Sequence, residues 1–322
     1  MALTDIRALI SEDLAAIDGE IRRQLHTRVP LIDTIAHYIV SSGGKRLRPM
    51  IVVLAARALA YEGDAHVKSA AIIEFIHTAT LLHDDVVDES NLRRGRQTAN
   101  SVYGNAASVL TGDFLYSRAF QMMVQIGDMQ VMEVLADATN VIAEGEVQQL
   151  VNCHDPDTTE ARYLEVIRHK TAKLFEAGAQ LAAILGGQPA EIAGQLAVYG
   201  MRLGTAFQLR DDALDYDASA EEIGKNIGDD LAEGKPTMPL IHAIRVGTPE
   251  QVSLVRRAIE TGGRDEIEAV IAAVRNSGAL DYTHQRAREE ADAALAALAP
   301  LPDSVYKDAL ASLASISVSR SH

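Results

Sequence analysis

Two acidic motifs, each at the end of a long apolar stretch with helical spacing, constrain this chain most. The first is His83-Asp84-Asp85-Val86-Val87-Asp88, which follows the apolar run 69–82. On a helix, Asp84 and Asp88 lie one turn apart on the same face, where their like charges repel. Packing alone would not favour that arrangement, whereas a hard cation such as Mg²⁺ binds carboxylate oxygens together with substrate phosphates. The pattern therefore predicts a metal site at the end of a buried helix.

The same pattern returns in Gln208-Leu209-Arg210-Asp211-Asp212-Ala213-Leu214-Asp215, after a helical stretch over 190–207. Asp211 and Asp215 are again four residues apart. An isolated acidic pair of this kind usually marks a solvated helix face. Two copies, each after a mainly apolar helix and each followed by basic residues, instead predict two acidic walls that bind several metal ions between them.

Length and composition predict one all-α domain. The chain has 322 residues, of which 48 % are hydrophobic, and no linker or low-complexity tract divides it, so we expect a single domain over 1–322. Trp is absent and aromatics make up 4 %, which favours helix over sheet. No segment is a strong strand candidate. The expected helices cover 4–29, 31–40, 50–61, 69–82, 106–127, 130–151, 163–185 and 190–207, with further amphipathic helices after 240.

Charge and hydropathy exclude several classes of function. The net charge of −15 argues against nucleic acid as a partner, because binding to nucleic acid depends on a basic surface. No uninterrupted apolar run reaches the length of about 18 residues that a membrane helix needs, so we expect no integral membrane segment. The N-terminus lacks the basic and then apolar layout of a signal peptide, and the single Cys153 fits a reducing compartment. These observations predict a cytoplasmic protein.

Basic residues accompany the acidic motifs. Lys45 and Arg48 lie where the helix 50–61 begins, and free backbone N–H groups at such a position attract anions. A solvated basic turn is the alternative for this cluster alone. Arg93 and Arg94 follow the first acidic motif directly, as suits a metal-bound pyrophosphate. His77 shares a helix face with Asp84, although a lone histidine on an apolar face is usually a core residue.

Two further loops have a plainer interpretation. The polar stretch 217–236, which contains Lys225 and Lys235, reads equally as a lid over a charged site or as a surface loop. In the loop 153–159, Asp157 and Glu160 match the spacing of a capping box before the helix 163–185.

In content and order these motifs resemble those of the trans-isoprenyl diphosphate synthases, over nearly the whole chain from Gly43 onward. Within that family, 75–80 and 143–147 are most similar to members that make an octaprenyl chain for quinones. The matching pieces are Gly43-Gly44-Lys45 with Arg48-Pro49, His77, Asp84-Asp85 with Asp88, Arg93-Arg94-Gly95, Gly112-Asp113, Gly145-Glu146, Lys170-Thr171-Ala172, Phe207-Gln208, Asp211-Asp212 with Asp215, Lys225, and Gly234-Lys235.

The resemblance implies a helical bundle around one deep cavity, working as a homodimer. It also implies a reaction that joins an allylic diphosphate, with farnesyl diphosphate the expected primer, to successive molecules of isopentenyl diphosphate. Breaking the allylic C–O bond leaves a carbocation and pyrophosphate, so the site must stabilise negative charge and exclude water. The Thr171 carbonyl or the Gln208 amide is a candidate to stabilise the cation.

Site residues are assigned from the resemblance by position. Mg²⁺ would be bound by Asp84, Asp88, Asp211 and Asp215. The catalytic set would be Asp84, Asp85, Asp88, Arg93, Lys170, Asp211, Asp212 and Lys225. The allylic diphosphate would be held by Arg93, Lys170, Thr171, Gln208, Lys225 and Lys235, and isopentenyl diphosphate by Lys45, Arg48, His77 and Arg94.

Product length should depend on the helix before Asp84. At about 5.4 Å per turn, Thr80, Ala79 and Ile76 line successive depths below the metal site. Thr80 and Ala79 are small, which predicts a long product with the cavity floor set deeper, by Phe120, Met122 or Met123. The alternative is that these residues are small because two helices pack closely. The exact number of units, from hepta- to decaprenyl, stays open at this point.

Two other functions use the same residue types. A class I terpene cyclase usually keeps one aspartate-rich motif and needs no isopentenyl pocket. A non-catalytic subunit that modulates another synthase characteristically loses aspartates. The two intact motifs, together with Lys45 and Arg48, favour the elongating prenyltransferase over both.

Overall fold

The computed structural model describes residues 1–41, 43–93, 95–217 and 228–319, and almost all of its regular structure is helical. The all-α prediction is therefore confirmed. The exception among these residues is a short antiparallel pair, β1 (Leu92–Arg93) with β2 (Arg96–Gln97), in which Leu92 pairs with Gln97. The sequence pattern gave no sign of it.

The chain forms two compact units, and each is assembled from separate stretches of sequence. Unit 1 comprises Met1–Thr139, Leu174–Gly200 and Leu298–Leu313, and unit 2 comprises Asn140–Lys173, Met201–Ala297 and Ala314–His322. Four helices contribute residues to both units: α8 (Met129–Asn152), α10 (Lys173–Leu185), α11 (Ala190–Leu214) and α17 (Val305–Val318). The single-domain prediction for 1–322 stays a prediction.

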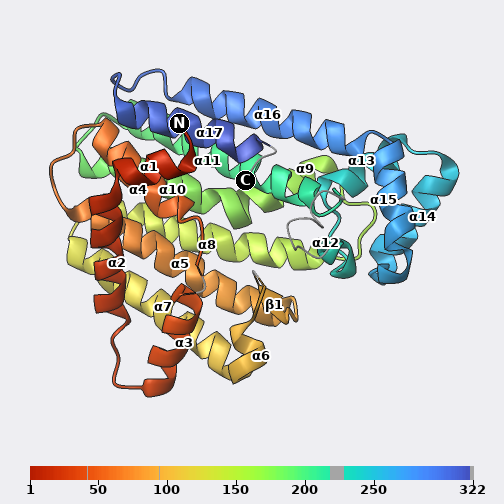
Figure 1. Ribbon diagram of the computed structural model, residues 1–322, viewed down its shortest axis with the longest axis horizontal. Helices are drawn as coiled ribbons and strands as arrows, with labels where there is room; N and C mark the ends of the chain where they lie inside the picture. The colour runs from red at the N-terminus through yellow and green to blue at the C-terminus, as the bar shows by residue number, and fades with distance from the viewer. Residues whose placement is uncertain (42, 94, 218–227, 320–322) are drawn as a thin grey trace. The chain divides into compact units, whose positions relative to one another are not determined.

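Unit 1 is organised around helix α5 (Ala65–Val87), which lies beside α7 (Figure 1) and also contacts α4 and α2. Its apolar residues between Ala70 and Leu82 are mostly buried, including Ile72, Phe75, Ile76 and Leu82, whereas Val87 at its end is 63 % exposed. A helix buried on several sides shows little amphipathic contrast, which is why the run 69–82 is apolar almost without interruption. The other elements of this unit are α1 (Leu3–Leu9), α2 (Ser11–Leu25), α3 (Pro30–Ser41), α4 (Leu47–Ala58), α6 (Ala99–Tyr103), α7 (Asn105–Ile126) and most of α10 (Lys173–Leu185).

The N-terminal helices differ from the expected ones in two places. The predicted helix 4–29 is two helices, because the backbone at Ile10 leaves helical geometry with φ −117° and ψ 27°. Pro30 does not interrupt a helix but begins α3, where its missing N–H costs nothing. Gly43 has φ +77°, a left-handed backbone conformation that glycine adopts without steric cost.

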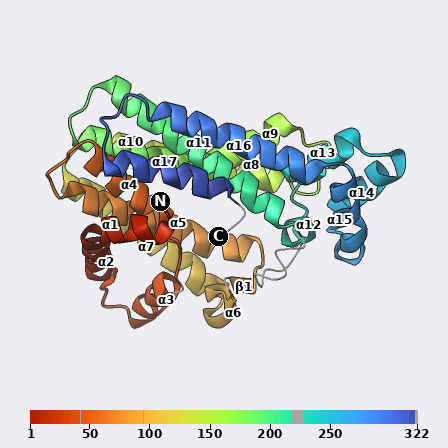
Figure 2. The same ribbon diagram turned by 45° about the horizontal axis from the view of Figure 1, so that its top comes forward.

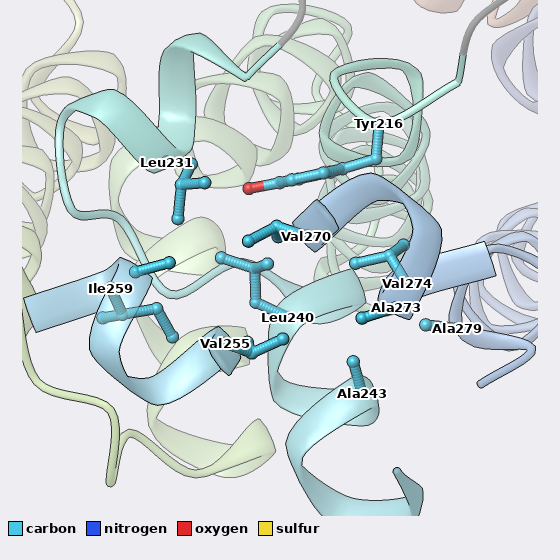
Figure 3. Close-up of a cluster of buried hydrophobic side chains, with 11 residues drawn as sticks. Tyr216, Leu231, Leu240, Ala243, Val255, Ile259, Val270, Ala273, Val274 and Ala279 are labelled. Carbon is cyan, nitrogen blue, oxygen red and sulfur yellow. The ribbon is translucent and has the colours of Figure 1, made fainter. Parts of the chain in front are cut away.

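Unit 2 has two apolar clusters around α13 (Met238–Val246). In one, α13 packs with α14 (Pro249–Thr261) and α15 (Ile267–Asn276), and Figure 3 shows Leu240 between side chains from both. Helices α14 and α15 lie side by side in both overall views (Figures 1 and 2). The other cluster joins α13 to α9 (Glu160–Ile167), α11 and α16 (Ala279–Ala297). The short helices α12 (Asp229–Ala232) and η3 (Arg264–Glu266) complete the described part of this unit.

The predicted helix 163–185 is three elements. Between α9 and α10 lies a π-helical turn, η1 (Arg168–Ala172), which carries Lys170 and Thr171. The start of α9 also differs from expectation: its N-cap is Thr159, whose hydroxyl accepts a hydrogen bond from the backbone N–H of Arg162 at 3.3 Å. The predicted capping box of Asp157 and Glu160 is therefore wrong by two positions.

Candidate active site

The first acidic motif occupies the last turn of α5, where helix geometry separates its three carboxylates. Asp84 and Asp88 are half-buried and one turn apart, with the Asp88 N–H donating to the Asp84 carbonyl at 2.8 Å. Asp85 points the other way and is completely buried. Its Oδ1 accepts a hydrogen bond from Arg93 Nε at 2.8 Å. Burial raises the pKa of Asp85 even though Arg93 opposes the shift.

The hairpin after α5 explains how Arg93 reaches Asp85. Arg93 ends β1, and Asn100 donates to the backbone carbonyls of Asp85 and Ser90 at 3.0 and 3.2 Å, which fixes the loop onto the helix end. Asn100 is a residue that sequence reasoning missed. Within the described parts of the chain, Asp85 Oδ2 is buried and accepts no hydrogen bond, so this carboxylate has spare acceptor capacity. Arg94 lies outside the described residues.

The structure brings Arg48 and His77 together, as their shared assignment to one substrate requires. Arg48 Nη1 donates to His77 Nε2 at 3.1 Å, and the guanidinium lies over the Phe175 ring, 4.4 Å from its centroid. Both residues are half-buried, and Lys45 is exposed on the segment before α4. Stacking on an aromatic face holds a guanidinium in a fixed plane, so its remaining donors have a defined direction.

In the second acidic motif, as in the first, the middle aspartate is the buried one. Asp211 is exposed, Asp212 is buried, and Asp215 is half-buried just after the end of α11. Burial raises the pKa of Asp212 to about 7 and that of Asp215 to about 6. Asp230 comes close from α12: its backbone N–H donates to Asp215 Oδ2 at 3.2 Å, and burial beside these carboxylates raises its own pKa.

This accumulation of negative charge suits a cation. Among the described residues, no three His, Cys, Asp or Glu side chains are grouped closely enough to hold a metal ion by themselves. Mg²⁺ does not need such a group, since it usually binds one or two carboxylates together with water and substrate phosphates. The donors of both motifs are oxygens, which is the ligand type of a hard divalent cation.

A chain of hydrogen bonds links the second motif to the π-helical turn. Tyr163 donates its hydroxyl to Asp212 Oδ2 at 2.6 Å, and Gln208 Nε2 donates to Asp212 Oδ1 at 2.7 Å. Thr171 in turn donates its hydroxyl to Gln208 Oε1 at 3.1 Å. Both oxygens of Asp212 are thus occupied by neighbours in unit 2. Tyr163 was not among the predicted site residues.

Lys170 is fixed by the C-terminal half of α8. Its Nζ donates to Gln149 Oε1 at 2.7 Å and pairs with Glu146 Oε2 at 2.6 Å. Gly145 permits this close approach, because a Cβ there would lie 2.7 Å from both His169 Cβ and Lys170 N. Lys235 pairs with Glu233 at 2.5 Å, and Lys225 lies outside the described residues.

Comparison with known proteins decides the family. The polyprenyl synthetase family model matches residues 29–275. The chain belongs to the polyprenyl synthetase family. Octaprenyl diphosphate synthase of Escherichia coli (strain K12) is 59 % identical over 321 residues, with 99 % of each chain covered. This polyprenyl synthetase is therefore an enzyme, a long-chain prenyltransferase that extends an allylic diphosphate with isopentenyl diphosphate.

Two solved structures resemble this polyprenyl synthetase over nearly their full length. A decaprenyl diphosphate synthase from Rhodobacter capsulatus is 45 % identical, with a TM-score of 0.95 and complete coverage of both chains. A polyprenyl synthase from Caulobacter crescentus, complexed with calcium and isoprenyl diphosphate, is 44 % identical, with a TM-score of 0.95 and coverage of 99 % and 98 %. The family is metal-dependent. In the described part of this polyprenyl synthetase, no helix is both long and apolar enough to span a bilayer.

The predicted chain-length residues of this polyprenyl synthetase lie on α5 and α7, which pack together. Ile76 and Ala79 are completely buried on α5, and Met122 and Met123 are buried on α7. Thr80 is half-buried, with its hydroxyl bonded to the His77 carbonyl at 2.8 Å. Phe120 differs from the others, because 36 % of it is exposed.

Proposed function

We propose that this protein is an octaprenyl diphosphate synthase that uses Mg²⁺ and takes farnesyl diphosphate as its primer. The observation that carries the proposal is the 59 % identity, over 99 % of both chains, to an octaprenyl diphosphate synthase. The site is consistent with it, since two acidic helix ends each have basic side chains nearby.

In the proposed reaction, the enzyme stabilises the pyrophosphate that leaves the allylic carbon. Asp84, Asp88, Asp211 and Asp215 would hold Mg²⁺, which when bound neutralises charge that builds on the leaving group. Lys170 adds a cation whose position is fixed by Gln149. The departing pyrophosphate accepts the final proton, so no side-chain base is required.

The remaining assignments divide by substrate. Arg48 and His77, with Lys45 and Arg94, would hold isopentenyl diphosphate, and their mutual contact supports a shared task. Arg93, Thr171, Gln208, Lys225 and Lys235 would serve the allylic diphosphate. Arg93 would do so while paired with Asp85, and that pairing also gives Asp85 a supporting role rather than direct metal contact.

Homodimer formation is part of the proposal. Three apolar side chains on one stripe of α7 are exposed in the single chain: Leu110 by 63 %, Phe120 by 36 % and Val124 by 67 %. Exposed apolar groups at helical spacing are typical of an interface that a second copy covers. Cytoplasmic residence stays a prediction.

One incubation tests the activity. Purified protein is mixed with farnesyl diphosphate, labelled isopentenyl diphosphate and Mg²⁺, and the dephosphorylated products are separated by reversed-phase chromatography. We expect label in an eight-unit chain and none when Mg²⁺ is chelated. A longer or shorter chain would correct the product length, a cyclic hydrocarbon made without isopentenyl diphosphate would indicate a cyclase, and no turnover would indicate a modulating subunit.

A further inference from the structure

We propose that Tyr163 and Asp212 are positioning residues that fix the direction of the hydrogen bonds running through Gln208 to Thr171. Neither would contact substrate; both would act through the Gln208 amide and the Thr171 hydroxyl. The inference rests on the proposed function, because it assigns Thr171 and Gln208 to the allylic substrate.

The chain of contacts joins three elements of unit 2. Tyr163 comes from α9, Thr171 from the π-helical turn, and Gln208 with Asp212 from one face of α11, four residues apart. The four groups are connected by three hydrogen bonds of 2.6, 2.7 and 3.1 Å. Tyr163 and Asp212 are buried, whereas Gln208 and Thr171 are half-buried. The buried half of the network therefore supports a half that a substrate can reach.

The direction of each hydrogen bond follows from which of the two groups can donate a proton. The pKa of Tyr163 lies well above its usual value because the phenol is buried beside Asp212, so Tyr163 keeps its proton and donates it. The other carboxylate oxygen accepts from the Gln208 NH₂ group, which turns the amide oxygen toward Thr171. The Thr171 hydroxyl must then donate its single proton to that oxygen. Its lone pairs are left for an electron-poor substrate atom.

This arrangement has a chemical use in ionisation of an allylic diphosphate. Positive charge develops on the allylic carbon while the C–O bond breaks. A hydroxyl dipole whose oxygen lone pairs already face that carbon stabilises the charge without having to reorient. A Thr171 hydroxyl that rotated freely would present its proton for part of the time. Tyr163 and Asp212 prevent this through Gln208.

Substitution of Tyr163 by Phe removes one buried hydroxyl and leaves the ring in place. Tyr199→Phe is the matched control, because Tyr199 is also fully buried and its hydroxyl donates to the Leu310 carbonyl at 2.9 Å in unit 1, outside the site. We expect both variants to lose a similar amount of Tm. Only Tyr163→Phe should lower kcat, roughly 10-fold, as loss of a supporting hydrogen bond commonly does, with the KM for isopentenyl diphosphate unchanged. Equal kcat values in the two variants would overturn the proposal.

A double-mutant cycle tests transmission through Gln208. The hydroxyl of Tyr163 bonds to Asp212 and that of Thr171 to Gln208, so independent roles of Tyr163 and Thr171 predict additive losses of kcat. We expect Thr171→Val to lower kcat, and the addition of Tyr163→Phe to Thr171→Val to lower kcat no further. Thr171→Ser keeps the hydroxyl, so in that background Tyr163→Phe should again lower kcat. Additive losses would show that Tyr163 does not act through Thr171.

Binding of Mg²⁺ with inorganic pyrophosphate, measured by calorimetry, separates this role from metal ligation. Asp211→Asn should weaken that binding, whereas Tyr163→Phe should leave it unchanged. Equal weakening in both variants would make Asp212 a metal ligand and overturn the positioning role. Wild-type protein that makes a chain of another length would correct the proposed product and leave these comparisons valid, since each is made against the wild type.

Discussion

At the scale of single residues, the pair of Asp85 and Arg93 tests how the first motif is held together. Asp85 is completely buried, and Arg93 is 31 % exposed. Removal of the guanidinium leaves a buried carboxylate without its charge partner, which is costly. We expect Arg93→Gln to lower Tm by about 4–8 °C, the shift for roughly 2 kcal/mol in a unit of this size. Thermal unfolding followed by circular dichroism measures it.

The double variant supplies the control for this pair. Asp85→Asn together with Arg93→Gln removes both charges, so its Tm should lie above that of Arg93→Gln alone. A Tm loss equal to the sum of the single losses would show that the two side chains are not coupled.

Ala79 and Thr80 give a second residue-scale prediction, on product length. Thr80→Tyr should shorten the main product while turnover is kept. Thr80 is half-buried and one turn below Asp84, so a larger side chain there would block the growing chain. Ala79 is completely buried, and it is small either because it lines the product cavity or because two helices pack closely there. Ala79→Tyr distinguishes between these two explanations. A shorter product at unchanged Tm indicates a cavity wall, whereas a large fall in Tm without a shorter product indicates close helix packing. Product chromatography and thermal unfolding decide between them.

The residue types of the site were predictable, and their partners were not. A spacing of four residues placed Asp84 with Asp88 and Asp211 with Asp215. The resemblance put the middle aspartates, Asp85 and Asp212, in the catalytic set, but the sequence did not indicate which side chains they contact. Tyr163 lies 49 positions from Asp212, and only the packing of α9 against α11 brings them together. No local pattern carries that information.

At the scale of elements, the π-helical turn makes Gly145 a critical position. A methyl group there would lie 2.7 Å from Lys170 N, so Gly145→Ala must displace the backbone that carries Lys170 and Thr171. We expect a higher KM for the allylic diphosphate and a kcat at least about 10-fold lower, since small misplacement of binding groups is costly. Steady-state kinetics with each substrate varied measures both.

Gly194→Ala is the control for Gly145. Gly194 is also a helical glycine, but nothing lies within 4 Å of an added Cβ. Its replacement should leave kinetics unchanged and raise Tm slightly, because alanine loses less backbone entropy than glycine in a helix. Normal kinetics in Gly145→Ala would contradict the assigned role of the turn.

A second element-scale prediction concerns the junction of α2, α4 and α5, where Asp13 accepts hydrogen bonds from Arg57 at 2.6 and 3.1 Å and from His66 at 2.9 Å. Burial alone would raise the pKa of Asp13, but the hydrogen bonds and charges of Arg57 and His66 outweigh it and lower the pKa. A lowered folded pKa stabilises the fold above the unfolded pKa of about 3.9, and that contribution is lost as the pH falls through the folded pKa.

Substitution of Asp13 by Asn should therefore lower Tm at pH 7 by about 4–8 °C, and this loss of Tm should shrink progressively as the pH falls below about 3.9. Glu12→Gln, at the exposed neighbouring position, should show no such pH dependence. Thermal unfolding of both variants across pH measures the difference, and a constant Tm loss for Asp13→Asn would contradict the linkage.

Elements with a strong periodic pattern were predicted well, and those fixed by few residues were not. Helices α3, α7 and α8 follow apolar spacing over several turns, and their ends lie within one residue of those expected, whereas α5 extends four residues before and five residues beyond the expected 69–82. The break at Ile10, the two-residue strands and the π-helical turn each depend on one or two residues and on tertiary contacts. The spacing of apolar residues is judged over several helical turns, so it does not reveal features that involve one or two residues.

At the scale of the whole molecule, the exposed stripe on α7 predicts the oligomeric state. Leu110→Lys combined with Val124→Lys places two charges where the proposed dimer buries apolar surface, so we expect the mass in solution to fall from that of two chains to that of one. Light scattering coupled to size-exclusion chromatography measures it. Val246→Lys is the control, because Val246 is 51 % exposed on α13 and is not part of the stripe. Dimers that persist in the double variant would place the interface elsewhere.

The discontinuous make-up of the two units has a consequence for biosynthesis. Unit 1 begins at Met1 but includes Leu298–Leu313, and unit 2 includes residues after 313. At ribosomal speeds of 5–20 residues per second, roughly 15–60 s pass between the first residue and residue 298. During that interval the nascent α5, apolar nearly all round, has neither its full set of neighbours nor a completed unit. Nascent chains of this protein should therefore depend on chaperones until residues 298–313 have been synthesised.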